Sequence, residues 1–286
     1  MPKTLLNIYS EHRTLYTVHC TLKITLNIMP FIWVTLAFVI LLFLQRWTHT
    51  HLHGLSLLIS GRPEYAVILY AIVLLPGVIL HELSHWLAAT LLGVQTGKLS
   101  LMPTRQADGS IQLGYVEYYK GRTLGPIRES IIGGAPLITG TLAILFIGFR
   151  VFDVPALTTA IQSGNVDQLT LALANLFQTA DFFVWLYLLF AISNAMMPSA
   201  SDRRAWPAFL LTMLVIAAFT FLLGLTDAMV AHLAQPVTAV FGYLSVALSM
   251  SIGVDLVFMA FIALLEALVG RIKGVSVRYH VNTTPD

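Results

Sequence analysis

The stretch LLPGVILHELSHWLAATLLG, Leu74 to Gly93, sets two histidines and a glutamate within a long apolar run. A charged side chain near the centre of a membrane helix costs roughly 2.5–3.5 kcal/mol on insertion scales. Ionisable residues at such positions are rare, and most of those that persist have a function. His81, Glu82 and His85 therefore predict both a membrane helix and a chemical use for it.

The composition supports an integral membrane protein. Of the 286 residues, 57% are hydrophobic and only 10% are charged, whereas soluble domains average about 25% charged residues. We therefore expect residues 1–286 to form a single integral membrane domain. The net charge of +2 and the absence of a dense basic run exclude nucleic acid as a partner. A single cysteine excludes an intrachain disulfide framework.

The apolar runs predict an all-α polytopic fold with about six transmembrane helices, since one crossing needs roughly 20 mostly apolar residues. Five or seven spans are the alternatives. We expect the fourth span to extend back from Asp181 through LTLALANLFQTA, which alternatively forms an interfacial helix. The last run should be interrupted at Ser251–Asp255. The predicted spans are Ile28–Leu44, Ala66–Gly93, Ile127–Phe149, one ending near Met197, Trp206–Leu225 and one within Val237–Gly270.

The basic residues predict how these spans are oriented. With six spans and the N-terminus inside, all of the sixteen Lys and Arg except Arg46, Arg62 and Arg150 fall on the cytoplasmic side. This asymmetry is what the positive-inside rule requires. It predicts a multi-pass protein of the cell membrane with both termini in the cytoplasm.

The motif His-Glu-Leu-Ser-His has the pattern H-E-x-x-H. On a helix, His81 and His85 lie one turn apart on the same face, so their rings can bind one zinc ion. Glu82 can then accept a proton from a zinc-bound water, whose pKa falls to about 7. Pro76 and Gly77 are expected to kink the helix and open a polar pocket. The alternative is that the three polar side chains only hold helices together.

Two histidines and a water leave one position in the coordination sphere of zinc, so a third protein ligand is needed. Glu117 lies in a polar loop, and Glu129 and Glu266 lie near span ends. The better candidate is Asp202, in SNAMMPSASDRRAWP at the cytoplasmic end of the fourth span. The alternative is an interfacial aspartate paired with one of the two arginines that follow it.

These two motifs resemble those of the site-2 protease family of intramembrane zinc metalloproteases. That family pairs H-E-x-x-H with a later Asn-x-x-Pro-x-Pro-x-x-Asp-Gly stretch, whose aspartate is the third zinc ligand. Asn194 and Asp202 keep the eight-residue separation, with Pro198 between them. The chain departs from the pattern in having one proline, shifted by a residue, and Arg203 in place of the glycine. The resemblance covers roughly Pro76–Arg204.

The resemblance implies a metalloprotease core at residues 66–204 and a set of site residues. It implies that Glu82 acts as the general acid and base. Asn194 is expected to orient the substrate backbone, and a helix-packing asparagine is the alternative. Both halves of the site approach the cytoplasmic side, although Asp202 must dip into the membrane. The zinc ligands implied are His81, His85 and Asp202.

The segment GKLSLMPTRQADGSIQLGYVEYYKG, residues 97–121, predicts a cytoplasmic or membrane-associated β hairpin or small sheet that turns at Asp108-Gly109. A plain loop is the alternative. The family has a β element beside the active site, and a strand edge could hold an unwound substrate segment in extended form. The following IIGGAPLITG contains small residues that allow close helix packing.

Other polar residues in apolar surroundings are weaker candidates. THTHLHG places His49, His51 and His53 at period two, which indicates an interfacial polar stretch or, on an extended strand, a metal site. Asp181 and Asp255 lie within or beside spans and are secondary candidates for functional carboxylates.

Together these features predict a zinc endopeptidase that cleaves membrane-protein substrates in or near a transmembrane helix within the lipid bilayer. The substrate helix must unwind first, because a helical carbonyl is already hydrogen-bonded. The alternative is a non-catalytic scaffold or regulatory relative with the same fold. A transporter is disfavoured because paired repeats with matching broken helices are not evident.

Overall fold

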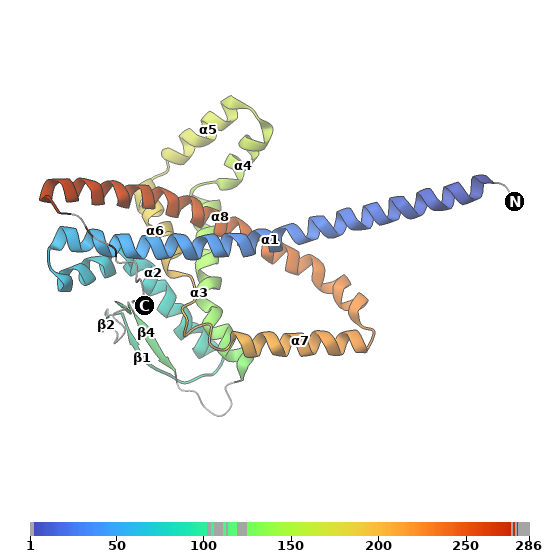
Figure 1. Cartoon of the computed structure of the whole chain (residues 1–286), viewed down its shortest axis with the longest axis horizontal. Helices are drawn as coiled ribbons and strands as arrows, with labels where there is room; N and C mark the ends of the chain where they lie inside the picture. The colour runs from blue at the N-terminus through green and yellow to red at the C-terminus, as the bar shows by residue number, and fades with distance from the viewer. Residues whose placement is uncertain are drawn as a thin grey trace, which may run out of the picture.

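A computed structural model of the chain describes residues 3–101, 104–105, 111–112, 114–118, 125–275, 277 and 279. The described part is mainly helical with a small β element (Figure 1), which confirms the all-α class with a β hairpin. The helices are α1 (Lys3–Ser60), α2 (Pro63–Leu91), α3 (Pro126–Phe146, extended by a π-helical turn over Ile147–Val151), α4 (Val154–Ser163), α5 (Val166–Phe177), α6 (Phe182–Ala195), α7 (Trp206–Leu222) and α8 (Thr226–Lys273). The strands are β1 (Thr96–Ser100), β2 (Thr104–Arg105), β3 (Ile111–Gln112) and β4 (Tyr115–Tyr118).

Four helices of the described part are long and apolar enough to cross a membrane. The pair α5 and α6 makes a fifth if its two helices form one broken span. Helix α7, with 17 residues, is shorter than the roughly 20 that a crossing needs. The prediction of a multi-pass membrane protein is confirmed, and the structure supports up to five spans rather than six. The four single stretches are Ile28–Ser60, Pro63–Leu91, Pro126–Val151 and His232–Lys273.

Helices α1 and α8 pack side by side and run in the same direction (Figure 1). Six successive crossings would make the first and last spans antiparallel, whereas five crossings make them parallel. This packing therefore agrees with five spans. It gives no support to the prediction that both termini lie on one side of the membrane. Contact pairs along the two helices keep a nearly constant separation in sequence: Trp33 with Ser249, His51 with Glu266, and Leu58 with Lys273.

Two spans differ in shape from what the sequence predicts: the span made of α5 and α6 is sharply bent, and α8 is not interrupted. Helices α5 and α6 meet at an angle of 85°, and Asp181 between them has a left-handed φ of 56°, which asparagine and aspartate tolerate better than most residues. Helix α8 instead continues through Ser251–Asp255 without a break. Ser251 donates its hydroxyl to the Ala247 carbonyl of its own helix, so this polar residue does not interrupt the helical hydrogen bonding.

The β element follows α2, which ends just before Gly93 with its left-handed φ of 70°. Strand β1 pairs antiparallel with β4, with Ser100 opposite Tyr115, and β2 pairs antiparallel with β3. The predicted β character of residues 97–121 is therefore confirmed. The turn predicted at Asp108-Gly109 lies outside the described residues.

Small residues let α2, α3 and α6 approach closely. A Cβ atom on Gly77 of α2 would collide with the carbonyl oxygen of Ala191 in α6. A Cβ atom on Gly133 of α3 would collide with the carbonyl oxygen of Asp202. Lipid provides little hydrophobic drive between helices, so close van der Waals contact of this kind contributes much of their association. The close packing predicted for IIGGAPLITG is confirmed.

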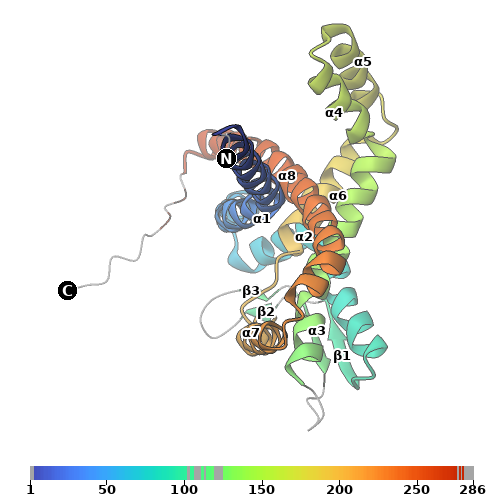
Figure 2. The ribbon, with the colours of Figure 1, turned by 90° about the vertical axis from the view of Figure 1, so that its right-hand side faces the viewer.

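The bundle has two distinct ends. Helices α4 and α5 project from one end, and the β element lies at the other (Figures 1 and 2). Many large apolar side chains are exposed along the spans, and no residue of α7 is buried. Such a surface suits a bilayer. His81 and His85 lie in the half of α2 that leads into the β element.

Candidate metal centre

Helix α2 places His81 and His85 on one face. The helix begins with Pro63 in its first turn, which suits a helix start, and continues through Pro76 to Leu91. The two imidazoles are one turn apart, with ring centroids separated by 4.7 Å. Their Nε2 atoms lie 3.1 Å from each other. The spacing of the motif therefore brings two nitrogen atoms to one point, as predicted.

Each ring is oriented by a backbone carbonyl of another helix. His81 Nδ1 lies 2.6 Å from the carbonyl oxygen of Ala195, at the end of α6. His85 Nδ1 lies 2.8 Å from the carbonyl oxygen of Ile132 in α3. A carbonyl oxygen only accepts, so each Nδ1 carries the proton and donates it. In the neutral ring this leaves Nε2 with a lone pair, which is the arrangement that a metal-binding histidine needs.

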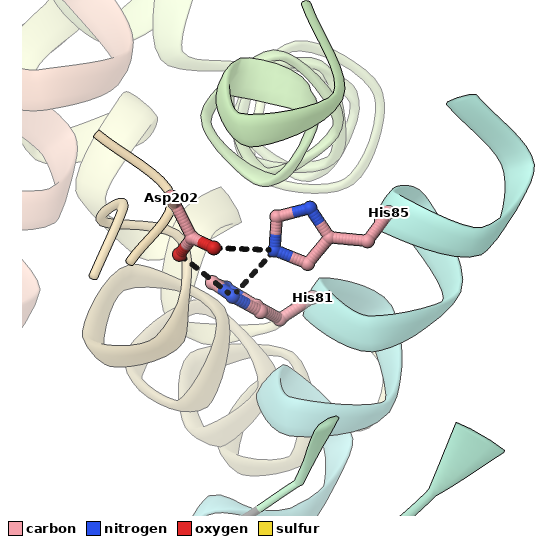
Figure 3. Close-up of side chains that lie close together, drawn as sticks. All are labelled: His81, His85 and Asp202. Carbon is pink, nitrogen blue, oxygen red and sulfur yellow. Dashed lines mark hydrogen bonds and ion pairs between the residues drawn. The ribbon is translucent and has the colours of Figure 1, made fainter. Parts of the chain in front are cut away.

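The loop between α6 and α7 supplies Asp202. The Ser199 amide donates to Asp202 Oδ2 at 2.7 Å, and the Asp202 amide donates to Ser199 Oγ at 3.3 Å. On its other side the Asp202 backbone rests against Gly133 of α3, where a side chain would not fit. This packing turns the carboxylate toward the two histidines (Figure 3).

The ligand atoms of the three side chains are separated by the distances expected when all three bind one metal ion. Asp202 Oδ1 lies 3.3 Å from His85 Nε2, and Asp202 Oδ2 lies 3.6 Å from His81 Nε2. Two ligand atoms on a tetrahedral zinc ion, each about 2.0–2.1 Å from it, are about 3.3 Å apart. The observed separations lie close to this value. Among the residues that the structure describes, these three form the group that could hold a metal ion.

The charges of this group also call for a cation. Two imidazole lone pairs and a carboxylate that converge repel each other unless a positive charge lies between them. Burial opposes ionisation of the Asp202 carboxyl, but hydrogen bonding with His81, His85 and the Ser199 amide outweighs it, so the pKa of Asp202 is lowered from its usual range. The hydrogen bonds from His81 and His85 to Asp202 form only when Nε2 of the ring carries a proton. A bound metal ion would replace that proton and use the Nε2 lone pair.

Glu82 lies beside the metal-ligand group and against the β element. Its side chain is buried, with 7% of the residue exposed. A Cβ atom on Gly114, the residue before β4, would lie 2.9 Å from Glu82 Cγ and 3.1 Å from Glu82 Oε1. The same Cβ would lie 3.1 Å from the Ser100 carbonyl oxygen of β1. The strand ends β1 and β4 therefore pack over the carboxylate predicted to transfer protons.

The predicted substrate residue Asn194 is buried in the last turn of α6, with 4% of the residue exposed. Its Nδ2 atom donates to the Phe190 carbonyl at 3.0 Å and to Asp255 Oδ1 at 2.9 Å. Both amide protons are thus in use, which is the packing arrangement named as the alternative. A role in substrate binding stays a prediction.

The secondary carboxylates do not join the metal-ligand group. Asp181 precedes the first residue of α6, while the His81 contact lies at the last residue of that helix, about 20 Å away along its axis. Asp255 is fully buried on α8 and accepts hydrogen bonds from Ser193 and Asn194.

The three histidines of THTHLHG lie on α1, so their period-two spacing spreads them around a helix. His49 Nδ1 hydrogen-bonds the Tyr70 hydroxyl, and His51 Nδ1 lies 2.8 Å from Glu266 Oε2. The extended strand that a metal site would have needed does not form. Glu117 lies on β4, where its Oε2 accepts from the Lys98 amide.

Several residues that shape the centre gave no signal in the sequence. The carbonyl oxygens of Ile132 and Ala195 orient the rings, but any residue type provides a carbonyl. Gly114 contacts Glu82 because of how the β element folds. Ser199 could have been found, since a serine three residues before an aspartate often forms a local turn with it.

Comparison of the chain with protein-family models, curated protein sequences and solved structures finds no match.

Proposed function

We propose that this chain is an intramembrane zinc endopeptidase. The observation that carries the proposal is the convergence of His81 Nε2, His85 Nε2 and an Asp202 carboxylate oxygen at separations of 3.1 to 3.6 Å. The donor set of two imidazoles and one carboxylate leaves a fourth tetrahedral position for water, as in catalytic zinc sites. Closed structural sites use four protein ligands instead.

Glu82 is the residue that moves protons in this proposal. Zinc, when bound, supplies a Lewis acid that polarises a peptide carbonyl and makes water a nucleophile at neutral pH. Glu82 follows His81 directly in the motif and is buried beside it. Its carboxylate accepts the proton of the attacking water as the new C–O bond forms. It then returns that proton to the leaving amine nitrogen as the C–N bond breaks, so it ends in its starting state.

The β element supports a peptide substrate in extended form. Strands β1 and β4 are paired only with each other in the described residues, so each has an outer edge to which an extended segment could add. A substrate segment that adds to such an edge would be held unwound next to Glu82. We therefore propose as the substrate class membrane proteins with a transmembrane helix that unwinds near one end, and we place the reaction in the cell membrane.

The experiment is the zinc content of the purified protein in detergent. We expect one zinc per chain in the wild type, loss of the metal in His81→Ala and a weaker site in Asp202→Ala. Matched controls are His232→Ala and Asp167→Ala, because these residues are exposed and lie on α8 and α5 away from the group. Both controls should keep the metal. A folded wild-type protein without zinc would instead favour the non-catalytic scaffold or regulator.

A second measurement separates metal binding from catalysis. Glu82→Gln should keep one zinc per chain but lose cleavage of single-span peptides reconstituted in liposomes, followed by mass spectrometry. The peptides should carry glycine or proline near one end, so that their helices unwind easily. A Glu82→Gln protein that binds zinc and still cleaves would contradict the assigned role.

A further inference from the structure

The last turn of α6 ends inside the molecule. The final carbonyl groups of a helix have no partner within it, and in a buried position they must find one elsewhere. Gln45 Nε2 of α1 donates to the Ser193 carbonyl at 2.7 Å, and His81 Nδ1 of α2 donates to the Ala195 carbonyl at 2.6 Å. Side chains of two neighbouring helices thus cap this end.

The side chains of the same turn are held from a third helix. Ser193 Oγ donates to Asp255 Oδ2 at 3.0 Å, and Asn194 Nδ2 donates to Asp255 Oδ1 at 2.9 Å. Asp255 belongs to α8 and is 0% exposed, as is Ser193. One carboxylate therefore holds two consecutive residues of α6. The next residue along the chain is Ala195, whose carbonyl orients His81.

The geometry points to Asp255 as a positioning residue for the metal centre. Asp255 holds Ser193 and Asn194, this fixes the last turn of α6, and that turn presents the Ala195 carbonyl to His81. The same turn leads into the loop that carries Asp202. Asp255 acts through these groups and touches neither the metal nor the substrate. The inference rests on the proposed metal centre, because it assigns a residue that keeps the ligands in place.

The hydrogen-bonding pattern explains why a carboxylate suits this position. Two donors approach Asp255 from adjacent residues, and a carboxylate offers one acceptor oxygen to each. Asn194 depends on this contact for its orientation, because its Oδ1 atom is buried and has no hydrogen-bond partner. Without Asp255, only the bond to the Phe190 carbonyl would orient the Asn194 amide. An apolar residue at 255 would take away the acceptor of the Ser193 hydroxyl and of one Asn194 N–H in the interior.

The test compares zinc affinity across variants of α8, measured by competition with a chromophoric chelator. Asp255→Leu should weaken zinc binding by about tenfold or more, the range seen when groups that orient metal ligands are removed. Asp255→Asn should stay within about threefold of the wild type, because asparagine can accept from Asn194 and donate to the Ser193 hydroxyl. The absorption spectrum of the cobalt-substituted protein should change in Asp255→Leu, because it reports ligand geometry.

Two controls separate positioning from general loss of structure. Ser251 lies one turn before Asp255, is 2% exposed and bonds only to its own helix among the described contacts, so Ser251→Ala should leave affinity and spectrum unchanged. Leu248 is fully buried on the same helix, and Leu248→Ala should lower thermal stability without changing the cobalt spectrum. An equal loss of affinity in Leu248→Ala and Asp255→Leu at matched stability would overturn the inference.

An exchange of the two partners provides a test that does not need Asp255→Leu to fold. Asn194→Asp alone sets two carboxylates against each other and should weaken zinc binding. Combining it with Asp255→Asn restores a donor opposite an acceptor and should recover affinity. Failure to recover overturns the inference, as does wild-type affinity in Asp255→Leu or an Asp255→Asn protein as weak as Asp255→Leu. A wild-type protein that binds no zinc would instead refute the proposed function, so the two failures are distinguishable.

Discussion

Replacing Gly133 with alanine should displace Asp202, the third ligand of the proposed metal site. The new methyl group would lie against the Asp202 carbonyl oxygen, and its Cβ would be 3.0 Å from the Asp202 carbonyl carbon. Carbon atoms in contact normally lie about 3.5–4.0 Å apart. The new Cβ would lie closer still to the Asp202 carbonyl oxygen, so the Asp202 backbone must retreat by about 1 Å or more. The tolerance on metal-ligand distances is only about 0.2 Å. The carboxylate would therefore leave its ligand position unless the loop rearranges.

The expected magnitude is a loss of zinc affinity of at least about tenfold, comparable to removal of a group that orients a metal ligand. The neighbouring Gly134 supplies the matched control, because a Cβ atom there meets nothing within 4 Å. Both substitutions raise helix propensity by up to about 1 kcal/mol in the same turn of α3, so this effect cancels between them. Only the contact with Asp202 differs.

The assay is chelator competition on Gly133→Ala, Gly134→Ala and wild-type protein purified side by side in detergent, with thermal unfolding followed in parallel. Gly134→Ala should bind zinc like the wild type. Equal zinc affinity in all three proteins would refute the reasoning, because it would show that the close approach of α3 does not determine where Asp202 lies.

Three further changes test other contacts. Gly114→Val should reduce peptide cleavage by about tenfold or more while zinc stays bound. A Cβ at position 114 would already lie 3.1 Å from Glu82 Oε1, so the larger valine side chain must displace the Glu82 carboxylate. Loss of zinc together with activity would contradict this prediction. Lys273→Met should lower the free energy of unfolding in detergent by about 1 kcal/mol. The reason is that Lys273 Nζ donates to the carbonyls of Leu58 and Ile59 at the end of α1. Unchanged stability would refute that contribution. Partial burial and the neighbouring Glu266 carboxylate raise the pKa of Tyr279. The Tyr279 phenol therefore stays protonated at neutral pH and donates to Glu266. The stabilisation of the fold by this hydrogen bond is lost only as pH rises through the raised pKa. Glu266→Gln should bring the pKa of Tyr279 back toward about 10 in an NMR titration, and an unchanged titration would exclude the carboxylate as a cause.

The sequence predicted that His81 and His85 lie together because the information was local. A four-residue separation on a helix puts His81 and His85 on one face whatever surrounds them. Asp202 is a different case, since its approach to the histidines depends on how α6, α3 and the following loop pack. Asp202 was chosen because the other carboxylates lie in a polar loop or near span ends, and SNAMMPSASD also resembles a family motif. In the structure its carboxylate oxygens lie 3.3 Å from His85 Nε2 and 3.6 Å from His81 Nε2.

The number and direction of spans were harder to predict, because hydropathy measures whether a helix can lie in lipid and not whether it crosses. The segment Trp206–Leu225 is apolar on every side, yet only 17 of its residues form α7. The direction of α8 follows from its contacts with α1, which link residues more than two hundred positions apart. A count of Lys and Arg on assumed loops cannot detect such pairing.

The prediction for Ser251–Asp255 failed for an instructive reason. Polar residues within an apolar run suggested an interruption, but polarity in a membrane helix can equally be satisfied by a neighbouring helix. Ser251 bonds within α8, and Asp255 bonds to α6. The sequence correctly marked Asp255 as unusual, but the groups that satisfy it lie about sixty residues away, where no local pattern shows them.

These contacts also explain how the loop after α6 brings Asp202 to the histidines although its sequence departs from the motif that it resembles. In a chain with two prolines, their fixed φ angles would help to determine the path after α6. Here one proline remains, and the end of α6 is held instead by Gln45, His81 and Asp255. Three helices therefore constrain the start of the loop, while Gly133 and Ser199 constrain its far end at the carboxylate. The position of the Asp202 carboxylate is thus set by tertiary packing around the loop, so substitutions of Asp255 in α8 or Gly133 in α3 should weaken the proposed metal site although neither residue lies in the motif.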